Sequence, residues 1–248
     1  MRSQASELED AYEVVRGGDA ENLLIICEHA SLRLPSPWSW PEEDAWIVGT
    51  HWSFDLGAAD LARDLARTLS CTAVLSRYTR LLIDPNRDLD SLTLFRGEAE
   101  GHAIRLNAAV DDDDRRRRIT DYYAPYHRRI ERALEAMPQA AILSVHTFTP
   151  VYEGQVRTVE VGVLFDRHPD LAQDFGREVR RGGWRTALNE PYSGQAGFAF
   201  SPELHAARHQ RRCLELEIRQ DLAVDQDRRP GLIAALEGAV RRTFFATS

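Results

Sequence analysis

The sequence predicts an α/β fold with a mostly parallel sheet that is covered by helices on both faces. Apolar runs of strand length alternate with stretches of helical periodicity along the 248 residues, the pattern of parallel strands joined by helical crossovers. Hydrophobic residues make up 43% of the chain and charged residues 28%, as in ordinary globular proteins. No internal repeat and no Gly/Ser-rich linker divides the chain, so residues 1–248 are expected to form a single domain.

The predicted elements follow one another in a regular order. The first strand is expected at 22–27, where five consecutive apolar residues suit burial on both faces and the prolines Pro35 and Pro37 prevent continuation. Later apolar runs predict strands at 71–76, 80–85, 140–148, 159–166 and 213–222. Apolar residues at helical spacing predict helices at 55–69, 119–137, 170–183 and 230–245, and Pro125 is expected to mark the start or a kink of the second.

Composition and charge argue against several classes of protein. A net charge of −8 is atypical of a general nucleic-acid binder, and the block DDDDRRRR at 111–118 is expected to be a solvated helix start. No apolar run has the length needed to cross a bilayer, and residues 1–15 lack the apolar core of a signal peptide. Three widely spaced cysteines without a C-x-x-C pair are interpreted as reduced thiols, so we expect a cytoplasmic protein.

Ionisable residues stand at the ends of several predicted strands. His29 follows the first strand after Glu28, His146 ends the strand at 140–148, and Asp55 opens the first helix. Alternation in CLELEI places Glu215, Glu217 and Arg219 on one side of their strand. Open α/β sheets bind ligands at the carboxyl ends of their strands, and two histidines with a carboxylate are typical of a hydrolytic zinc site. The alternative for His29 is a strand cap held by a backbone carbonyl.

A second polar group brackets the predicted strand at 80–85. Arg80, Asn86 and Arg87 are suited to binding a carboxylate, because a guanidinium offers two parallel hydrogen bonds. The alternative is structural: Arg87 would bridge to Asp84 or Asp88, and Asn86 would cap the turn.

The chain resembles the N-formylglutamate amidohydrolase family through seven short motifs in order. These are CEHAS (27–31), FDLGA (54–58), TRLLIDPNR (79–87), PYH (125–127), HTFTP (146–150), PYSG (191–194) and EIRQDL (217–222). The family is similar in fold to zinc carboxypeptidases and aspartoacylase, which implies a three-layer α/β/α sandwich around a mixed sheet. The resemblance further implies a zinc-dependent hydrolase that removes an acyl group, typically formyl, from a small-molecule N-acyl amino acid.

Carried over by position, the resemblance assigns His29 and His146 as zinc ligands and Asp55 as the third, with Glu28 as its competitor. It implies that Glu217 is the general base. Alternation is expected to point Glu28 away from His29.

The resemblance implies that the substrate carboxylate is bound by Arg80, Asn86 and Arg87. The loop that carries Tyr192 and Ser193 is expected to line the substrate, unless it is a plain turn. The other histidines, His51 and His127 among them, are expected to be structural. The family's first motif is PHSG-like where this chain has CEHAS, so the amino acid and the acyl group stay open. Alternatives are a deacylase for longer acyl groups, a carboxypeptidase-like hydrolase and a binding protein without catalysis. No nucleic acid or membrane partner is expected.

Overall fold

A mixed sheet forms the centre of the protein. The computed structural model describes residues 7–18 and 20–245. The sequence predicts no signal-peptide core in residues 1–15, and residues 1–6 of that segment lie outside the described residues. Within the described ranges the sheet has eight strands in the order β1-β2-β4-β3-β7-β12-β10-β11. The four central strands β4, β3, β7 and β12 run parallel, and the antiparallel pairings lie toward the two edges. The predicted mixed, mostly parallel sheet is therefore confirmed.

The sheet strands are β1 (Glu7–Leu8), β2 (Tyr12–Arg16), β3 (Ala20–Cys27), β4 (Cys71–Ser76), β7 (Ala141–Phe148), β10 (Val161–Leu164), β11 (Thr186–Leu188) and β12 (Cys213–Arg219). Two small hairpins add β5 (Glu98–Ala99) with β6 (His102–Ala103), and β8 (Val151–Tyr152) with β9 (Gln155–Val156). The helices are α1 (Ala58–Thr68), α2 (Asp112–Arg118), α3 (Ala124–Ala136), α4 (Pro169–Arg181), α5 (Phe200–His209), α6 (Gln220–Val224) and α7 (Arg229–Thr243).

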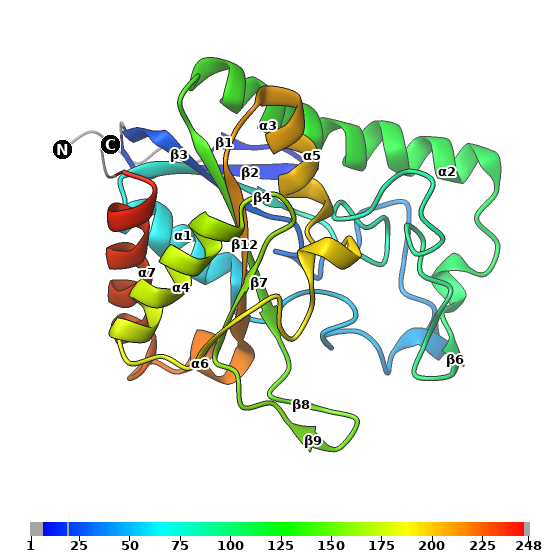
Figure 1. Ribbon diagram of the computed structural model, residues 1–248. Coiled ribbons are helices and arrows are strands. Elements are labelled where there is room, and N and C mark those ends of the chain that lie inside the picture. The colour runs from blue at the N-terminus through cyan, green and yellow to red at the C-terminus, as the bar shows by residue number, and fades with distance from the viewer. Residues whose placement is uncertain (1–6, 19, 246–248) are drawn as a thin grey trace.

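Helices cover both faces of the sheet, which gives the predicted three layers (Figure 1). On one face, Leu61 of α1, Phe175 of α4 and Leu236 of α7 pack against the odd-numbered residues of β3. On the other, Tyr126 and Ile130 of α3 pack with Ala206 of α5 against the even-numbered residues of β3. Because β3 is apolar at every position from Leu23 to Cys27, it can be buried on both faces.

Several expectations from the sequence are wrong in detail. No strand forms at the predicted 80–85. Residues 81–84 are buried, but their backbone is turn and irregular structure, because its N–H groups bond to Thr79 and Leu94 instead of to a neighbouring strand. Residues 220–224 form α6 and do not extend β12.

The stretch DDDDRRRR does begin a helix, since the Asp111 side chain caps α2. A π-helical turn, Ile119–Tyr123, then joins α2 to α3 ahead of Pro125, which has no N–H to donate. Strand β2 and helix α5 had no counterpart among the predictions.

A third, smaller core lies beside the sheet. It consists of Ile47, Leu81, Ala99 and Ile104, against which Trp52 packs. The Asp44 carboxylate fixes one side of it by accepting from the backbone N–H groups of residues 105 and 106, both at 2.8 Å. This part of the chain, residues 41–53 and 94–107, is called the side lobe below.

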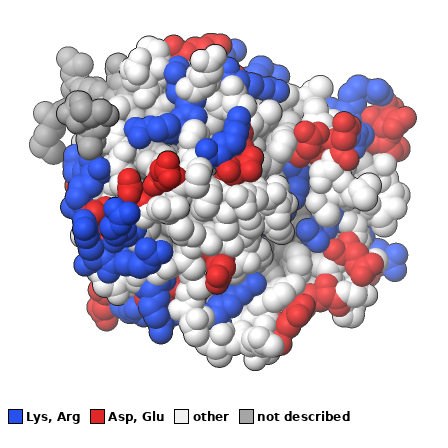
Figure 2. All heavy atoms as spheres, viewed as in Figure 1, with Lys and Arg blue, Asp and Glu red and all other residues white. Residues whose placement is uncertain are grey.

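The surface carries both charge signs. Arginine side chains gather over α4 and α7 on the face shown in Figure 2, where Arg181 and Arg242 pair with Glu178. Among the described residues no helix is long and apolar enough to span a membrane. Cys27, Cys71 and Cys213 are buried and unpaired, as expected.

Candidate active site

The site begins where two neighbouring strands change from apolar to polar on one face. On the α3/α5 face, β7 presents Ile142 to the core and His146 further along. β12 does the same with Cys213 first and Glu215 and Glu217 later. Because β7 and β12 are parallel with His146 opposite Glu217, these polar groups meet near the carboxyl ends of the strands. The predicted alternation in β12 is confirmed.

Two further residues reach the same point from loops. His29 follows the end of β3, and its backbone carbonyl accepts from the Asp55 N–H at 2.9 Å. This bond holds the loop before α1 against the end of β3. Asp55 lies three residues before the first residue of α1, so the helix begins later than predicted.

His29, Asp55 and His146 converge in the way that a metal site requires. One donor atom from each lies within 4.8 Å of the others. Asp55 Oδ2 is 2.8 Å from His146 Nδ1 and 3.4 Å from His29 Nδ1. Glu28, the competing third ligand, is not in this group. Its carboxylate turns toward His146 Nε2 and Ser144, at 3.1 and 2.7 Å.

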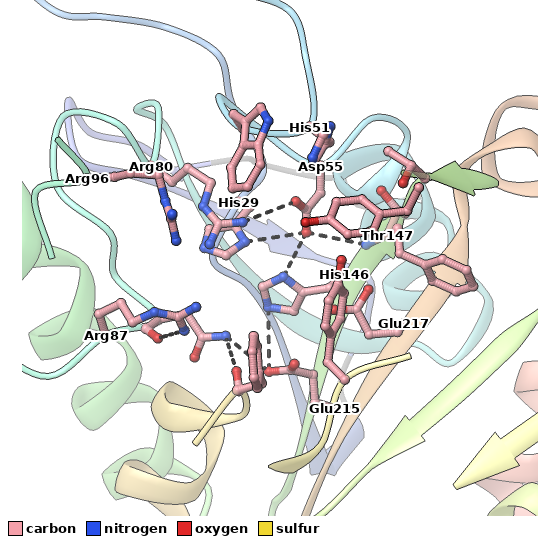
Figure 3. A pocket seen from close by; sticks show the side chains of 17 residues that line it. His29, His51, Asp55, Arg80, Arg87, Arg96, His146, Thr147, Glu215 and Glu217 are labelled. Carbon is pink, nitrogen blue, oxygen red and sulfur yellow. Dashed lines mark hydrogen bonds and ion pairs between the residues drawn. The ribbon is translucent and has the colours of Figure 1, made fainter. Parts of the chain in front are cut away.

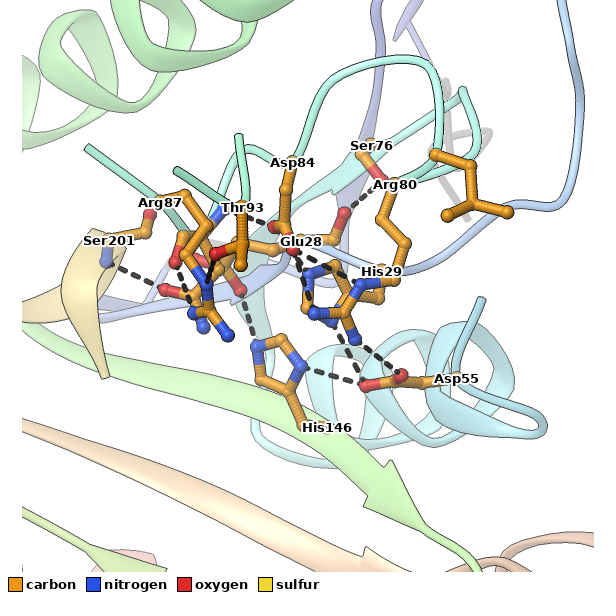
Figure 4. Close-up of polar contacts among 12 residues, drawn as sticks. Glu28, His29, Asp55, Ser76, Arg80, Asp84, Arg87, Thr93, His146 and Ser201 are labelled. Atoms are coloured by element: carbon orange, nitrogen blue, oxygen red, sulfur yellow. Dashed lines mark hydrogen bonds and ion pairs between the residues drawn. The ribbon is translucent and has the colours of Figure 1, made fainter. Parts of the chain in front are cut away.

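The second nitrogen of each histidine faces its own carboxylate (Figure 4). His29 Nε2 lies 2.8 Å from Asp84 Oδ1, and His146 Nε2 lies 3.1 Å from Glu28 Oε2. Protons on these Nε2 atoms leave the Nδ1 lone pairs facing Asp55, and His29 Nδ1 has no hydrogen-bond partner among the described residues. Three electron-pair donors that face one point repel each other unless a proton or a metal cation lies between them. The residues therefore fit a metal such as zinc, held by two imidazoles and one carboxylate with a position left open.

Charges around the site stabilise the ionised form of its aspartates. Burial opposes ionisation of Asp84, but Arg80 and His29 outweigh it and hold its pKa well below the ordinary value. Burial acts the same way on Asp55, whose pKa is nevertheless lowered by His29 and His146. Arg80 donates to Asp84 Oδ2 at 2.7 Å and lies 3.8 Å from Asp55 Oδ1. Arg80 is thus already paired with protein carboxylates.

Glu217 has the opposite environment. Its Oε2 is buried and has no hydrogen-bond partner among the residues that the structure describes. Burial, reinforced by the negative charges of Asp55 and Glu215, raises the pKa of Glu217 well above the ordinary value. Glu215 accepts from Asn86 Nδ2 at 3.2 Å, and burial raises its pKa to about 7. The cavity thus contains a carboxyl group that is free to exchange a proton.

A cavity of about 250 Å³ gives access to these groups. Figure 3 shows Arg80, Arg87 and Arg96 on one side of the histidines and Glu217 on the other. Within the described residues Arg87 forms no bridge to Asp84 or Asp88. Its guanidinium donates to the Asn86 carbonyl at 2.8 Å and lies 5.5 Å from the ring centre of Phe198.

Asn86 lines the cavity, but its side chain already bonds to the protein. The Nδ2 group donates to Phe198 O at 2.9 Å and to Glu215, and Oδ1 accepts from Ser201 N at 2.8 Å. Tyr192 also lines the cavity, stacked on Phe198. Ser193 is not among the lining residues, and its carbonyl accepts from the N–H of residue 196 at 3.1 Å.

Sequence reasoning missed several residues of the site. Asp84 and Glu28 were not recognised as partners of the histidines, and Arg96 was not singled out. His51, expected to be structural, lines the cavity with its buried Nε2 unpartnered in the described part of the chain. The position of Asp84 within the motif TRLLIDPNR was the one available signal for it.

Fold and cavity define the class: a three-layer α/β protein whose buried ionisable groups gather at the carboxyl ends of parallel strands, as in hydrolytic enzymes. The family model for N-formylglutamate amidohydrolase matches residues 21–224, and the chain belongs to this family. No curated protein matches the chain in sequence.

Two solved structures resemble the protein over nearly its whole length. The gene product Atu2144 of Agrobacterium tumefaciens is 27% identical with a TM-score of 0.85, and the match covers 95% of each chain. N-formylglutamate amidohydrolase from Ralstonia eutropha JMP134 is 21% identical with a TM-score of 0.64, covering 94% of this chain and 97% of that one. The second likeness supports the fold, and the chemistry is argued from the site.

Proposed function

We propose that this protein is a metal-dependent amidohydrolase, with zinc as its metal, that removes the formyl group from an N-acyl amino acid such as N-formylglutamate. The observation that carries the proposal is the convergence of His29, Asp55 and His146 in a cavity that also contains Glu217 with an unpartnered oxygen. Membership of the family supports hydrolysis of an amide bond. The three buried free thiols fit a reducing compartment, which agrees with a cytoplasmic enzyme.

The metal supplies Lewis-acid chemistry at the amide carbonyl and lowers the pKa of a nearby water molecule. Glu217 takes a proton from the water as it attacks the carbonyl carbon. It then delivers this proton to the nitrogen as the C–N bond breaks, so the products are the acid and the free amine. Because Glu217 Oε2 has no hydrogen-bond partner among the described residues, the carboxylate is free to hold the proton between the two steps.

Arg87 is assigned to the α-carboxylate of the substrate. Its guanidinium faces the cavity and has no carboxylate partner among the described residues, whereas Arg80 is paired with Asp84. Arg80 therefore keeps Asp84 ionised beside His29 and lies near the reacting group. Asn86 orients Glu215, Tyr192 forms a wall of the cavity, and Ser193 shapes the loop that presents Tyr192.

The proposal is tested by measuring zinc content and hydrolysis of N-formyl, N-acetyl and N-carbamoyl amino acids. We expect one zinc per chain, and we expect His29→Ala and His146→Ala to lose both metal and activity while the fold is kept. His102→Ala is the matched control, since His102 is exposed and outside the cavity. Full metal occupancy in either site variant would remove that residue from the ligand set. Equal rates for chelated and zinc-loaded protein would refute metal dependence.

A further inference from the structure

The cavity contains more positive charge than the substrate α-carboxylate needs. Three arginines line it, and of these only Arg80 forms ion pairs among the described residues, with Asp84 and Asp55. Neither Arg87 nor Arg96 forms an ion pair with any described residue. The guanidinium groups of Arg87 and Arg96 thus face one small cavity without an ion-pair partner among the described residues. One substrate α-carboxylate would neutralise only Arg87 and leave Arg96 unpaired.

Arg96 is held in place by the side lobe. Its guanidinium lies 5.0 Å from the ring centre of Trp52, and the Trp52 indole N–H donates to Glu100 at 2.9 Å. The backbone carbonyl of Arg96 accepts from Asn107 Nδ2 at 3.0 Å. The same side-chain amide of Asn107 also donates to Leu81 O at 2.8 Å. Stacking on an indole leaves the edge of a guanidinium and its N–H donors free for a planar anion.

The surroundings of Arg96 favour an incoming anion. Figure 3 shows Arg96 next to Arg80, and both lie across the histidines from Glu217. Burial and the like charge of Arg80 lower the pKa of Arg96 from its ordinary value. Both effects disfavour the bare cation, and a bound carboxylate offsets both. A neutral group at this position would leave the cation uncompensated.

We propose that Arg96, stacked on Trp52, is a specificity-determining residue that binds the side-chain carboxylate of a dicarboxylic N-acyl amino acid. This inference rests on the proposed function, in which Arg87 binds the α-carboxylate and the amide lies over the histidines. Arg96 then selects against substrates with a neutral side chain, because such substrates leave its partly buried charge unpaired.

Binding of glutarate and of glutaramate tests the proposal without catalysis. Glutarate presents two carboxylates at the spacing found in glutamate, and glutaramate replaces one of them by a neutral amide of similar shape. We expect calorimetry to show that Arg96→Gln weakens glutarate binding by about tenfold or more and glutaramate binding by about twofold or less. Arg96→Lys keeps the charge without the planar fork and should be intermediate. Unchanged melting temperatures confirm that the variants fold.

Kinetics provide the second measurement. The kcat/KM ratio of N-formylglutamate to N-formylglutamine should fall by about tenfold or more in Arg96→Gln. Arg87→Gln, the matched control, should impair both substrates. The inference is overturned if Arg96→Gln affects both glutarate and glutaramate equally, or neither. If the glutarate result holds but no N-acyl amino acid is hydrolysed, the proposed function fails and the assignment of Arg96 stands.

Discussion

Asp84→Asn is predicted to weaken zinc binding although Asp84 is not a ligand. The carboxylate accepts from His29 Nε2 at 2.8 Å, from Arg80 at 2.7 Å and from the Asn86 N–H at 2.9 Å. It therefore holds the His29 ring in place and determines which nitrogen carries the proton. Loss of such a carboxylate typically costs 10- to 100-fold in metal affinity, so we expect about 1.4–2.8 kcal/mol.

Competition with a chromophoric chelator at constant pH measures this effect. Asp88→Asn is the control, because Asp88 lies four residues along the same loop and is exposed. Among the described residues its carboxylate bonds only to the N–H of residue 90. The control should bind zinc as the wild type does. If Asp84→Asn and Asp88→Asn have the same zinc affinity, Asp84 does not support His29 and the argument from paired carboxylates is refuted.

Three further predictions concern chemistry, recognition and pH. Glu217→Gln should keep zinc and substrate affinity but lose about 10²–10⁴-fold in turnover, measured by single-turnover kinetics, and the same phenotype in Glu215→Gln instead would show that Glu215 is the base. Arg87→Ala should raise KM for an acyl amino acid far more than for its α-amide, and equal losses for both would show that Arg87 does not bind the α-carboxylate. Burial and the neighbouring His205 lower the pKa of His127 from 6.5 to about 3, so the unfolded chain takes up a proton that the folded chain excludes, and stability is lost as pH falls below about 6.5. Urea unfolding from pH 6.5 to 5.5 should therefore cost the wild type about 1 kcal/mol more than His127→Asn, and equal losses would contradict the assigned shift.

The central strands and the site's main ionisable groups were predictable because both depend on local pattern. The run that ends at Cys27 and the alternation around Glu217 determine the core and the side chains that point to the cavity. The strand predicted at 80–85 was wrong because burial alone does not distinguish a strand from a buried turn. Such a distinction depends on hydrogen bonds to Leu94, which follows ten residues later.

The carboxylates behind the histidines were missed for a related reason. The pairing of Asp84 with His29 spans 55 positions, and that of Glu28 with His146 spans 118. No periodicity in the chain reports such contacts. The expectation that Glu28 points away from His29 also hid its role, because its carboxylate instead meets Ser144 and His146 of β7.

The side lobe has its own small core, apart from the two layers that cover the sheet. Replacing Arg96 or Trp52 therefore alters one wall of the cavity without opening a void beneath His146 or Glu217. A variant can therefore accept a substrate with a different side chain without losing its catalytic groups. An engineer seeking a different acylated amino acid should vary the lobe residues that line the cavity, His51, Trp52 and Arg96, where a failed substitution costs recognition and leaves the catalytic groups in place.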